Sequence, residues 1–393
     1  MHRSVILGAA RTPFGRLLGG LAPRSAVDLG TVAARGAIER SQVPAAEIGY
    51  CVFGTVIQAG QGHIPSRQVS LAVGMREDAG SETVNKVCAS GLRAIAIADV
   101  LVKVGDYATV LAGGTESMTN APHLAMGARK GYRFGDATLI DSMIWDALRD
   151  PWTGKQMFEQ AAAVGAELGI DRAELDAWSA RSHERAIAAI DSGRFAEEIV
   201  PVTVPGRKGD TVIDTDEGPR RDTSVEALAA LKPLTPGGTH TAGNSPGVND
   251  GAAAVVVASE EEAQRRGLQP LAIIRATACT ADRHDRLARV PALAAQMALE
   301  KAALTASDID RLEINEAFAS VAFNSTKMLN VSEDRVNVNG GAVALGHPVG
   351  ASGARLIVTL IHELRRNGGG IGVAAICSGG GQGDAMVLEV PRP

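Results

Sequence analysis

NVNGGAVALGHPVGASGARLI, at residues 337–357, places a single histidine, His347, in a glycine-rich turn that precedes a predicted helix. The glycines of this stretch allow backbone conformations that side chains would block, and they let a ligand approach the main chain closely. Apolar residues recur at helical spacing after the turn and predict a helix over about residues 351–366. The free N–H groups of its first turn would face the glycines, where they can stabilise negative charge. The stretch therefore predicts a functional site at a helix N-terminus.

A weaker copy of this pattern lies in the first half of the chain. ASG at 89–91 precedes one predicted helix, ASG at 351–353 precedes another, and an apolar strand and a glycine cluster follow each helix. Duplication of an α/β half is the simplest explanation, and a chance match of small-residue turns is the alternative. In the duplicated arrangement Cys88 and His347 stand at corresponding helix starts. A pseudo-twofold axis would then bring these two side chains face to face.

Between the two copies the chain changes character. Two charged helical patterns occupy about residues 156–168 and 171–190, and Asp171 with Glu174 forms a capping box at the start of the second. Near the N-terminus, Ser25 is expected to cap a helix that ends at about Arg40. We therefore predict an α/β protein with an N-terminal half at 1–120 that is completed by about 246–270. A loop domain is expected at 121–245 and a C-terminal half at 271–393.

Length and composition exclude several classes of protein. A chain of 393 residues is too long for one ordinary core, and its 45% apolar content is that of a globular protein. A net charge of -5 and an aromatic content of 3% argue against a nucleic-acid partner. No apolar run approaches the length of a membrane span and no export signal is visible, so we expect no membrane partner and a cytoplasmic location.

The four cysteines are candidates for different roles. They are far apart in the sequence and form no CxxC pair, so neither a zinc site nor a disulfide framework is indicated, and no histidine set suggests a metal. Cys88 lies at a predicted strand-to-helix junction, where the helix N-terminus would favour the thiolate and make it a nucleophile. Cys377 precedes SGGGQG and is either an exposed thiol or a buried strand-end residue. Cys51 and Cys279 are expected to be small buried hydrophobes.

Three polar residues could act with these thiols. His347 is expected to activate a cysteine, either by deprotonating it or by remaining cationic beside it, and a packed structural histidine is the alternative. In LEINEAFAS, Asn315 and Glu316 interrupt an apolar, helix-like run, so this pair must be solvated or bonded to something specific. A helix cap at Asn315 is the structural alternative.

Six motifs together resemble the thiolase family, which contains acetyl-CoA acetyltransferases and 3-ketoacyl-CoA thiolases. They are NKVCASG, GGTESMTNAPH, AGNSPGVNDGAAA, NEAFAS, NVNGGAVALGHPVGASGAR and CSGGGQG, in the order the family has them. The resemblance implies two similar α/β halves in a five-layered αβαβα core, with an inserted loop domain over the coenzyme A site. It also implies a homodimer or homotetramer that acts on acyl-CoA substrates without a metal or other cofactor.

The resemblance also implies a role for each site residue. Cys88 would be acylated, His347 would activate it, and Cys377 would be the acid and base that moves protons during condensation. Asn315, holding a water, would form one oxyanion site with His347, and the N–H groups of Cys88 and Gly379 would form the other. Claisen condensation of two thioesters needs these separate functions. Contacts to coenzyme A and substrate are expected from Met157, Arg220, Ser245, Gly247, Ala317 and Phe318.

The chain departs from the family pattern near the expected acyl pocket and coenzyme site. Gln156, Phe158 and Gln160 are unusual in their segment, and Pro246 replaces a common serine. These departures bear on acyl-chain choice, so three activities remain open. They are an acetyl-CoA acetyltransferase, a 3-ketoacyl-CoA thiolase for longer chains, and a catalytically silent protein that binds acyl-CoA or serves as a scaffold. Retention of both thiols, the histidine and Asn315 favours an enzyme.

Overall fold

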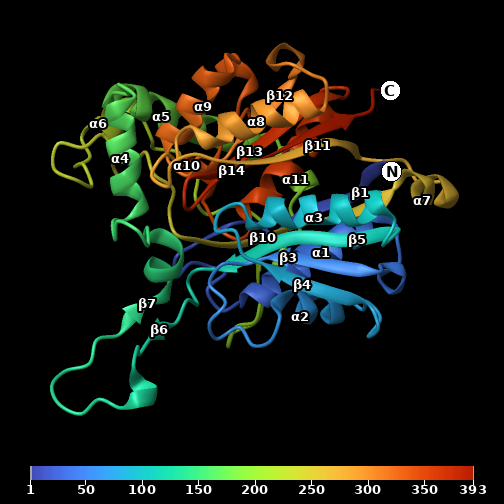
Figure 1. Cartoon of the computed structure of the whole chain (residues 1–393), viewed down its shortest axis with the longest axis horizontal. Coiled ribbons are helices and arrows are strands. Elements are labelled where there is room, and N and C mark those ends of the chain that lie inside the picture. The colour runs from blue at the N-terminus through green and yellow to red at the C-terminus, as the bar shows by residue number, and fades with distance from the viewer. Residues whose placement is uncertain (1, 393) are drawn as a thin grey trace.

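The computed structural model describes residues 2–392 and divides into two similar halves, each a sheet with helices on both faces (Figure 1). The strands of the N-terminal half lie in the order β4-β3-β5-β10-β1, and those of the C-terminal half in the order β12-β13-β14-β11. Their bounds are β1 Ser4–Arg11, β3 Tyr50–Gly54, β4 Gly80–Val84, β5 Thr109–Ser117, β10 Asn249–Ser259, β11 Ala272–Ala281, β12 Arg311–Ile314, β13 Gly370–Ser378 and β14 Gln382–Val390.

Four strands of each half pair in the same way, and β4 has no counterpart in the described C-terminal half. β3 runs parallel to β5, β5 antiparallel to β10, and β10 antiparallel to β1; in the same way β12 runs parallel to β13, β13 antiparallel to β14, and β14 antiparallel to β11. The sheets join where Val5 and Ile6 of β1 pair with Ile273 and Ala272 of β11. This shared order confirms the α/β duplication that the two ASG segments predict.

Helices complete the five layers. The central layer holds α3 and α11, and the outer layers hold α1 with α2 and α8 with α9. The bounds are α1 Ala26–Ser41, α2 Pro65–Ala72, α3 Ser90–Val104, α8 Val290–Lys301, α9 Ala319–Leu329 and α11 Ser352–Arg366. Three large apolar clusters fill the spaces between these layers. Along β10, Val255 and Val257 face the central cluster while Ala254 and Val256 face the outer one, so both faces of the strand are buried.

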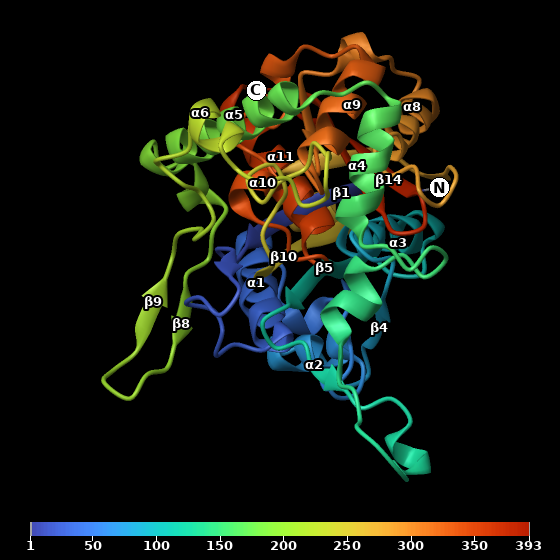
Figure 2. The same ribbon diagram turned by 90° about the vertical axis from the view of Figure 1, so that its left-hand side faces the viewer.

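The region between β5 and β10 lies beside the end of the central helices, and two arms extend from it away from the core (Figure 2). One arm carries β6 and β7, and the other carries β8 and β9. The helices and short strands of the region are β6 His123–Leu124, η2 Ala128–Lys130, β7 Ile140–Asp141, η3 Met143–Leu148, α4 Met157–Glu167, α5 Arg172–Asp191, η4 Arg194–Glu197, β8 Val202–Val204, β9 Thr211–Ile213 and α6 Val225–Ala229. The division of the chain at residues 120, 245 and 270 stays a prediction.

The remaining short elements connect these layers. They are β2 Gly15–Arg16, η1 Ala45–Glu47, α7 Glu260–Arg266, η5 Ala306–Asp308, η6 Glu333–Arg335 and α10 Ala342–Leu345. The predicted cap at Ser25 and the capping box at Asp171 are both confirmed. The helix-like interpretation of LEINEAFAS is wrong, because β12 ends at Ile314 and α9 begins only at Ala319. Asn315 therefore caps no helix and lies in a strand-to-helix turn.

The first turns of α3 and α11 pack against each other without side chains between them. A Cβ on Gly91 would lie 2.9 Å from the Ala354 nitrogen and the Gly350 oxygen, and one on Gly353 would lie 2.5 Å from the Leu92 nitrogen. Backbone thus meets backbone at the centre of the molecule, and only glycine permits that approach. The predicted correspondence of the two helix starts is confirmed, since each packs on the other.

We expect Gly353→Ala to lower the free energy of unfolding by about 1–3 kcal/mol, because the new methyl group overpacks backbone atoms that cannot move aside. Thermal unfolding of the purified variant measures the loss. Gly165→Ala in α4 is the matched control, since its Cβ would meet only ordinary contacts, the nearest at 3.5 Å. Gly165→Ala should leave the free energy of unfolding unchanged or raise it by up to about 1 kcal/mol. Equal melting temperatures for the two variants would contradict this account of the helix contact.

Candidate active site

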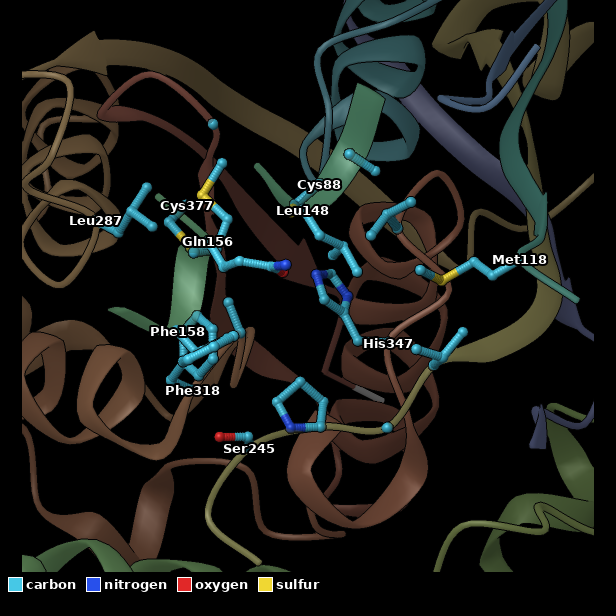
Figure 3. Close-up of a pocket in the computed structure, with 18 of the residues that line it drawn as sticks. Cys88, Met118, Leu148, Gln156, Phe158, Ser245, Leu287, Phe318, His347 and Cys377 are labelled. Carbon is cyan, nitrogen blue, oxygen red and sulfur yellow. The ribbon is translucent and has the colours of Figure 1, made fainter. Parts of the chain in front are cut away.

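A cavity of about 420 Å³ lies at the N-terminal ends of α3 and α11, and two thiols and a histidine line it (Figure 3). Figure 3 shows Cys88, Cys377 and His347 around a common space, although they come from widely separated parts of the sequence. The other predicted residues on its wall are Met157, Arg220, Ser245, Gly247, Ala317, Phe318 and Gly379. Asn315 is buried behind His347. The structure therefore brings the predicted site residues together.

Cys88 follows a tight turn that presents its thiol to the cavity. Val87 has φ +44°, a left-handed conformation that is a true outlier for a β-branched residue. The Ser90 hydroxyl donates to the Val87 carbonyl at 2.6 Å and accepts the Lys86 N–H at 2.8 Å, which closes the turn. Strain held in this way is common where a reactive side chain must point away from its strand.

His347 is held by contacts at its backbone and at one ring nitrogen. Its backbone N–H donates to Asn249 Oδ1 at 2.9 Å. The preceding residue, Gly346, has φ +106°, and the Asn249 side chain leaves no room for a Cβ at that position. The ring nitrogen Nδ1 lies 2.6 Å from the Ser352 hydroxyl, which donates its single hydrogen to the Pro348 carbonyl. Ser352 must then accept from Nδ1–H, so Nε2 is the unprotonated nitrogen and can accept a proton.

Asn315 and Glu316 have different environments. The Asn315 amide nitrogen lies 3.5 Å from His347 Nε2, while its Oδ1 is buried without a partner in the part of the chain that the structure describes. Glu316 accepts four hydrogen bonds, from Trp178, Ser182, Asn337 and the Val343 N–H. The prediction that this polar pair is bonded to specific groups is confirmed for Glu316. Glu316 ties α5 and the 337–343 segment to the end of β12.

Cys377 lies near the end of β13 and is 1% exposed, so the buried strand-end interpretation is the correct one. Gly379 follows on the cavity wall. Within residues 2–392, neither the Cys88 N–H nor the Gly379 N–H donates to another protein group. Two unused donors thus lie beside two thiols, which is the arrangement that stabilises a developing oxyanion.

Burial controls the protonation of all three groups. It raises the pKa of Cys88 to about 12, with the charge of Glu116 adding to the effect, and it raises the pKa of Cys377 well above its ordinary value. Burial, with a contribution from Arg355, lowers the pKa of His347 to about 3. The expected thiolate at the helix start is therefore wrong, as is the cationic form of His347. The resting site holds two neutral thiols and a neutral imidazole.

Sequence reasoning assigned no role to Glu116, although it lies in a motif quoted for the resemblance. This buried carboxylate accepts hydrogen bonds from the Val56 and Ile57 N–H groups, from the Thr55 hydroxyl and from the Gly350 N–H. It thereby clamps a loop of the N-terminal half to the turn that carries His347. The sequence feature that could have indicated this role is a charged residue at the end of an apolar strand, because a buried charge needs hydrogen-bond partners.

Two cysteines lie outside the cavity and differ from each other. Cys51 is fully buried, as predicted. Cys279 is exposed, so the prediction that it is a small buried hydrophobe is wrong. It lies on β11 opposite Asp384 of β14, close to the end of both strands.

A second cavity, of about 260 Å³, adjoins the first and shares Arg220, Ser245 and Gly247 with it. Arg16 and His183 also line it. The Arg220 N–H donates to His183 Nδ1 at 3.1 Å, and burial lowers the pKa of His183 to about 4, so this histidine is neutral. Cys88 and Cys377 line the first cavity and not the second.

A thiol that lines a cavity beside a neutral base and two free N–H donors defines a cysteine-dependent group-transfer site. The thiolase N-terminal domain matches residues 4–261, and the thiolase C-terminal domain matches residues 268–390. The chain belongs to the thiolase family, and it is an acyltransferase by that membership. Within residues 2–392, none of the helices is both long and apolar enough to cross a membrane.

Named relatives agree with this assignment. A probable acetyl-CoA acetyltransferase of Mycobacterium tuberculosis is 46% identical over 99% of this chain and 100% of its own length. An acetyl-CoA acetyltransferase of Chromobacterium violaceum is 44% identical over 98% of this chain and 99% of its own. The crystal structure of the Bacillus anthracis acetyl-CoA acetyltransferase superposes with a TM-score of 0.97 at 38% identity, and covers 100% of this chain and 99% of that one.

We expect the rate of the first acylation of Cys88 to be nearly independent of pH between about pH 5.5 and 7.5. The reactive pair is a neutral thiol and a neutral imidazole, and with a pKa of about 12 for Cys88 and about 3 for His347 its population is constant across this window. Rapid quenching followed by intact-mass analysis measures the rate. A simple thiol peptide is the control, because its thiolate fraction rises about tenfold per pH unit. The same tenfold dependence in the enzyme would show that a free thiolate is the nucleophile.

Proposed function

We propose that the protein is an acetyl-CoA C-acetyltransferase, which condenses two molecules of acetyl-CoA to acetoacetyl-CoA and coenzyme A and catalyses the reverse thiolysis. The observation that carries the proposal is the convergence of Cys88, Cys377 and His347 on one cavity beside two free N–H donors. The choice of acetyl as the acyl group rests on the names of the relatives, which are acetyl-CoA acetyltransferases. The proposed chemistry uses side chains and backbone N–H groups of this chain together with one bound water.

In the first half-reaction, Cys88 Sγ attacks the thioester carbonyl while His347 Nε2 takes the thiol proton. Because both groups begin neutral, the transfer creates an ion pair as the new bond forms, and no thiolate has to exist beforehand. The N–H groups of Cys88 and Gly379 stabilise the tetrahedral oxyanion. Cys377 gives its thiol proton to the departing coenzyme A, so acetyl-Cys88 remains beside a Cys377 thiolate and a His347 that keeps the transferred proton on Nε2.

In the second half-reaction, the Cys377 thiolate removes a proton from the α-carbon of a second acetyl-CoA and becomes a thiol again. His347, which donates from the proton on Nε2, and a water held by Asn315 would stabilise the enolate oxygen, since the buried Asn315 Oδ1 is free to bind that water. The enolate attacks acetyl-Cys88, Cys88 leaves as a thiolate, and His347 returns its proton to that sulfur, which restores the resting site. One thiol cannot be acylated and act as the base at the same time, which accounts for the two thiols.

The adjoining cavities suit an extended thioester. The acyl group and the pantetheine arm would occupy the first cavity, against Met157, Ala317 and Phe318, and the nucleotide would reach toward Arg16 and Arg220 in the second. Arginine is the usual partner of phosphate groups because its guanidinium donates in a fixed fork. Ser245 and Gly247 line both cavities and would lie along the arm.

The acyl end of the cavity is walled by large apolar side chains, which favours a short acyl group over the longer-chain alternative. These are Met118, Leu148, Met157, Phe158 and Leu287. Gln156 adds an amide that points toward His347 (Figure 3). A silent acyl-CoA-binding protein would need neither the second thiol nor the unused N–H donors, so that alternative has no support in the site.

A homodimer or homotetramer is also proposed, in a reducing compartment such as the cytoplasm, where both thiols persist. β4 is the edge strand of the N-terminal sheet, since it pairs only with β3 among the described residues. Such an edge is available to pair with a second copy across a twofold axis. A monomer in light scattering at micromolar concentration would contradict the oligomer.

We expect Cys88→Ser to abolish both acetylation and turnover, whereas Cys377→Ser still becomes acetylated by acetyl-CoA but condenses at least about a hundredfold more slowly. The difference follows from the separate roles of nucleophile and acid/base. Intact-mass analysis reports the acetyl group, and release of coenzyme A under steady-state conditions reports condensation. Cys51→Ser is a control outside the cavity. Stable acetylation of Cys88→Ser would remove the proposed nucleophile.

We expect kcat/KM for thiolysis of 3-ketoacyl-CoA substrates to be highest at four carbons and to decline with chain length. The apolar wall limits the acyl space, and each methylene is worth only about 1–3 kcal/mol, so the decline should be graded. A substrate series from about four to sixteen carbons measures it. Leu148→Ala should shift the optimum toward longer chains. A wild-type maximum at eight carbons or beyond would favour the longer-chain alternative.

A further inference from the structure

A second reactive cluster lies on the other side of the nucleophile turn, outside the cavity. Lys86 Nζ is 2.7 Å from Cys279 Sγ and 2.5 Å from Asp384 Oδ2. Cys279 and Asp384 are directly opposed on β11 and β14, so their side chains lie on the same face of the sheet. Lys86 belongs to the N-terminal half and reaches across to both. The two halves are therefore linked through Lys86, which precedes Cys88 by two residues in the sequence.

The cluster has the features of an oxidisable amine–thiol pair. Cys279 is exposed, so small oxidants reach its sulfur, while Asp384 is buried at 1% exposure and Lys86 is mostly covered. The nitrogen–sulfur distance is shorter than that of an ordinary N–H···S hydrogen bond and close to the span of one bridging oxygen atom. The proposed acyl transfer makes no use of Cys279 or of the lysine amine.

We propose that Lys86 and Cys279 form a reversible N–O–S cross-link when the protein meets hydrogen peroxide, and that this cross-link slows acylation of Cys88. The first peroxide oxidises the thiol to a sulfenic acid and is reduced to water. The second oxidises the sulfenic acid and the amine together. In that step the N–O bond forms, the peroxide O–O bond breaks, and two further waters are released.

Asp384 accepts the proton that Lys86 loses in this reaction. The lysine must lose a proton before its nitrogen can react, and the Asp384 carboxylate is in hydrogen-bond contact to accept it. Burial raises the pKa of the Asp384 carboxyl above its ordinary value, although Lys86 opposes the effect. The products are a neutral bridge, a neutral carboxyl group and water. The charged pair that joins the halves is thereby replaced by a covalent bond.

The cross-link would act on the nucleophile through the Lys86 backbone. The Lys86 carbonyl accepts the Ser378 hydroxyl, next to Cys377, and its N–H donates to Ser90. These bonds fix the turn that holds Val87 in its left-handed conformation. Because the bridge removes the charge of Lys86, it also removes the ion pair with Asp384 that holds this turn against β14. A shift of the turn would misplace the Cys88 thiol, and a small displacement is costly for a reacting atom.

Peptide mapping of the peroxide-treated full chain tests the cross-link. We expect a species that joins the peptide containing Lys86 to the one containing Cys279, with the combined mass plus one oxygen and minus two hydrogens. Dithiothreitol should abolish it, and it should be absent from Cys279→Ser and Lys86→Arg. Oxidation of Cys279 to sulfinic acid without any joined peptide would overturn the proposal. A joined peptide that lacks the oxygen would also overturn it.

Acylation after peroxide treatment tests the regulatory effect. Cys279→Ser is the matched control, because it keeps the catalytic thiols and should acetylate Cys88 at the untreated wild-type rate. Peroxide also attacks Cys88 and Cys377, but equally in both proteins. We expect a loss of acetylation rate that dithiothreitol reverses and that is several-fold larger in the wild type than in Cys279→Ser. Equal losses in the two proteins would show that the bridge does not control the site.

Discussion

The contact between the first turns of α3 and α11 is the constraint on which the rest of the structure depends. Gly91 and Gly353 let the two helices meet backbone to backbone, so the helix starts of the two halves come together in the middle of the protein. Their N-terminal ends then face one cavity, with a thiol contributed by one half and an imidazole by the other. A larger residue at either glycine would overpack this backbone contact.

Burial at this position gives the site its chemistry. In a low-dielectric interior the charged forms of cysteine and histidine are both disfavoured, so the thiol keeps its proton and the imidazole remains a free base. A proton can then pass from one to the other only as the substrate carbonyl accepts electrons. Ser352 directs His347 Nε2 toward this task by accepting from the other ring nitrogen.

Buried polar groups keep the cavity walls in place. Glu116 joins loop residues of the N-terminal half to Gly350, Glu316 joins α5 to the 337–343 segment, and the Lys86–Asp384 ion pair joins the nucleophile turn to β14. Each of these polar groups has its bonding partners in parts of the chain that are distant in the sequence. A buried ion pair contributes little net stability after desolvation but is costly to break, so such links position the site more than they strengthen the fold.

The sequence by itself determined the duplicated α/β organisation, the helix that follows His347, and the caps at Ser25 and Asp171. Those features depend on local patterns of glycine, capping residues and apolar spacing, which are visible at neighbouring positions. The full set of residues that meet in the site came instead from the resemblance of the motifs to the thiolase family. Only the tertiary structure decided the protonation of Cys88 and His347, the roles of Glu116 and Ser352, and the exposure of Cys279. Each of these depends on desolvation and on partners remote in the chain, and no local pattern records which distant groups surround a side chain.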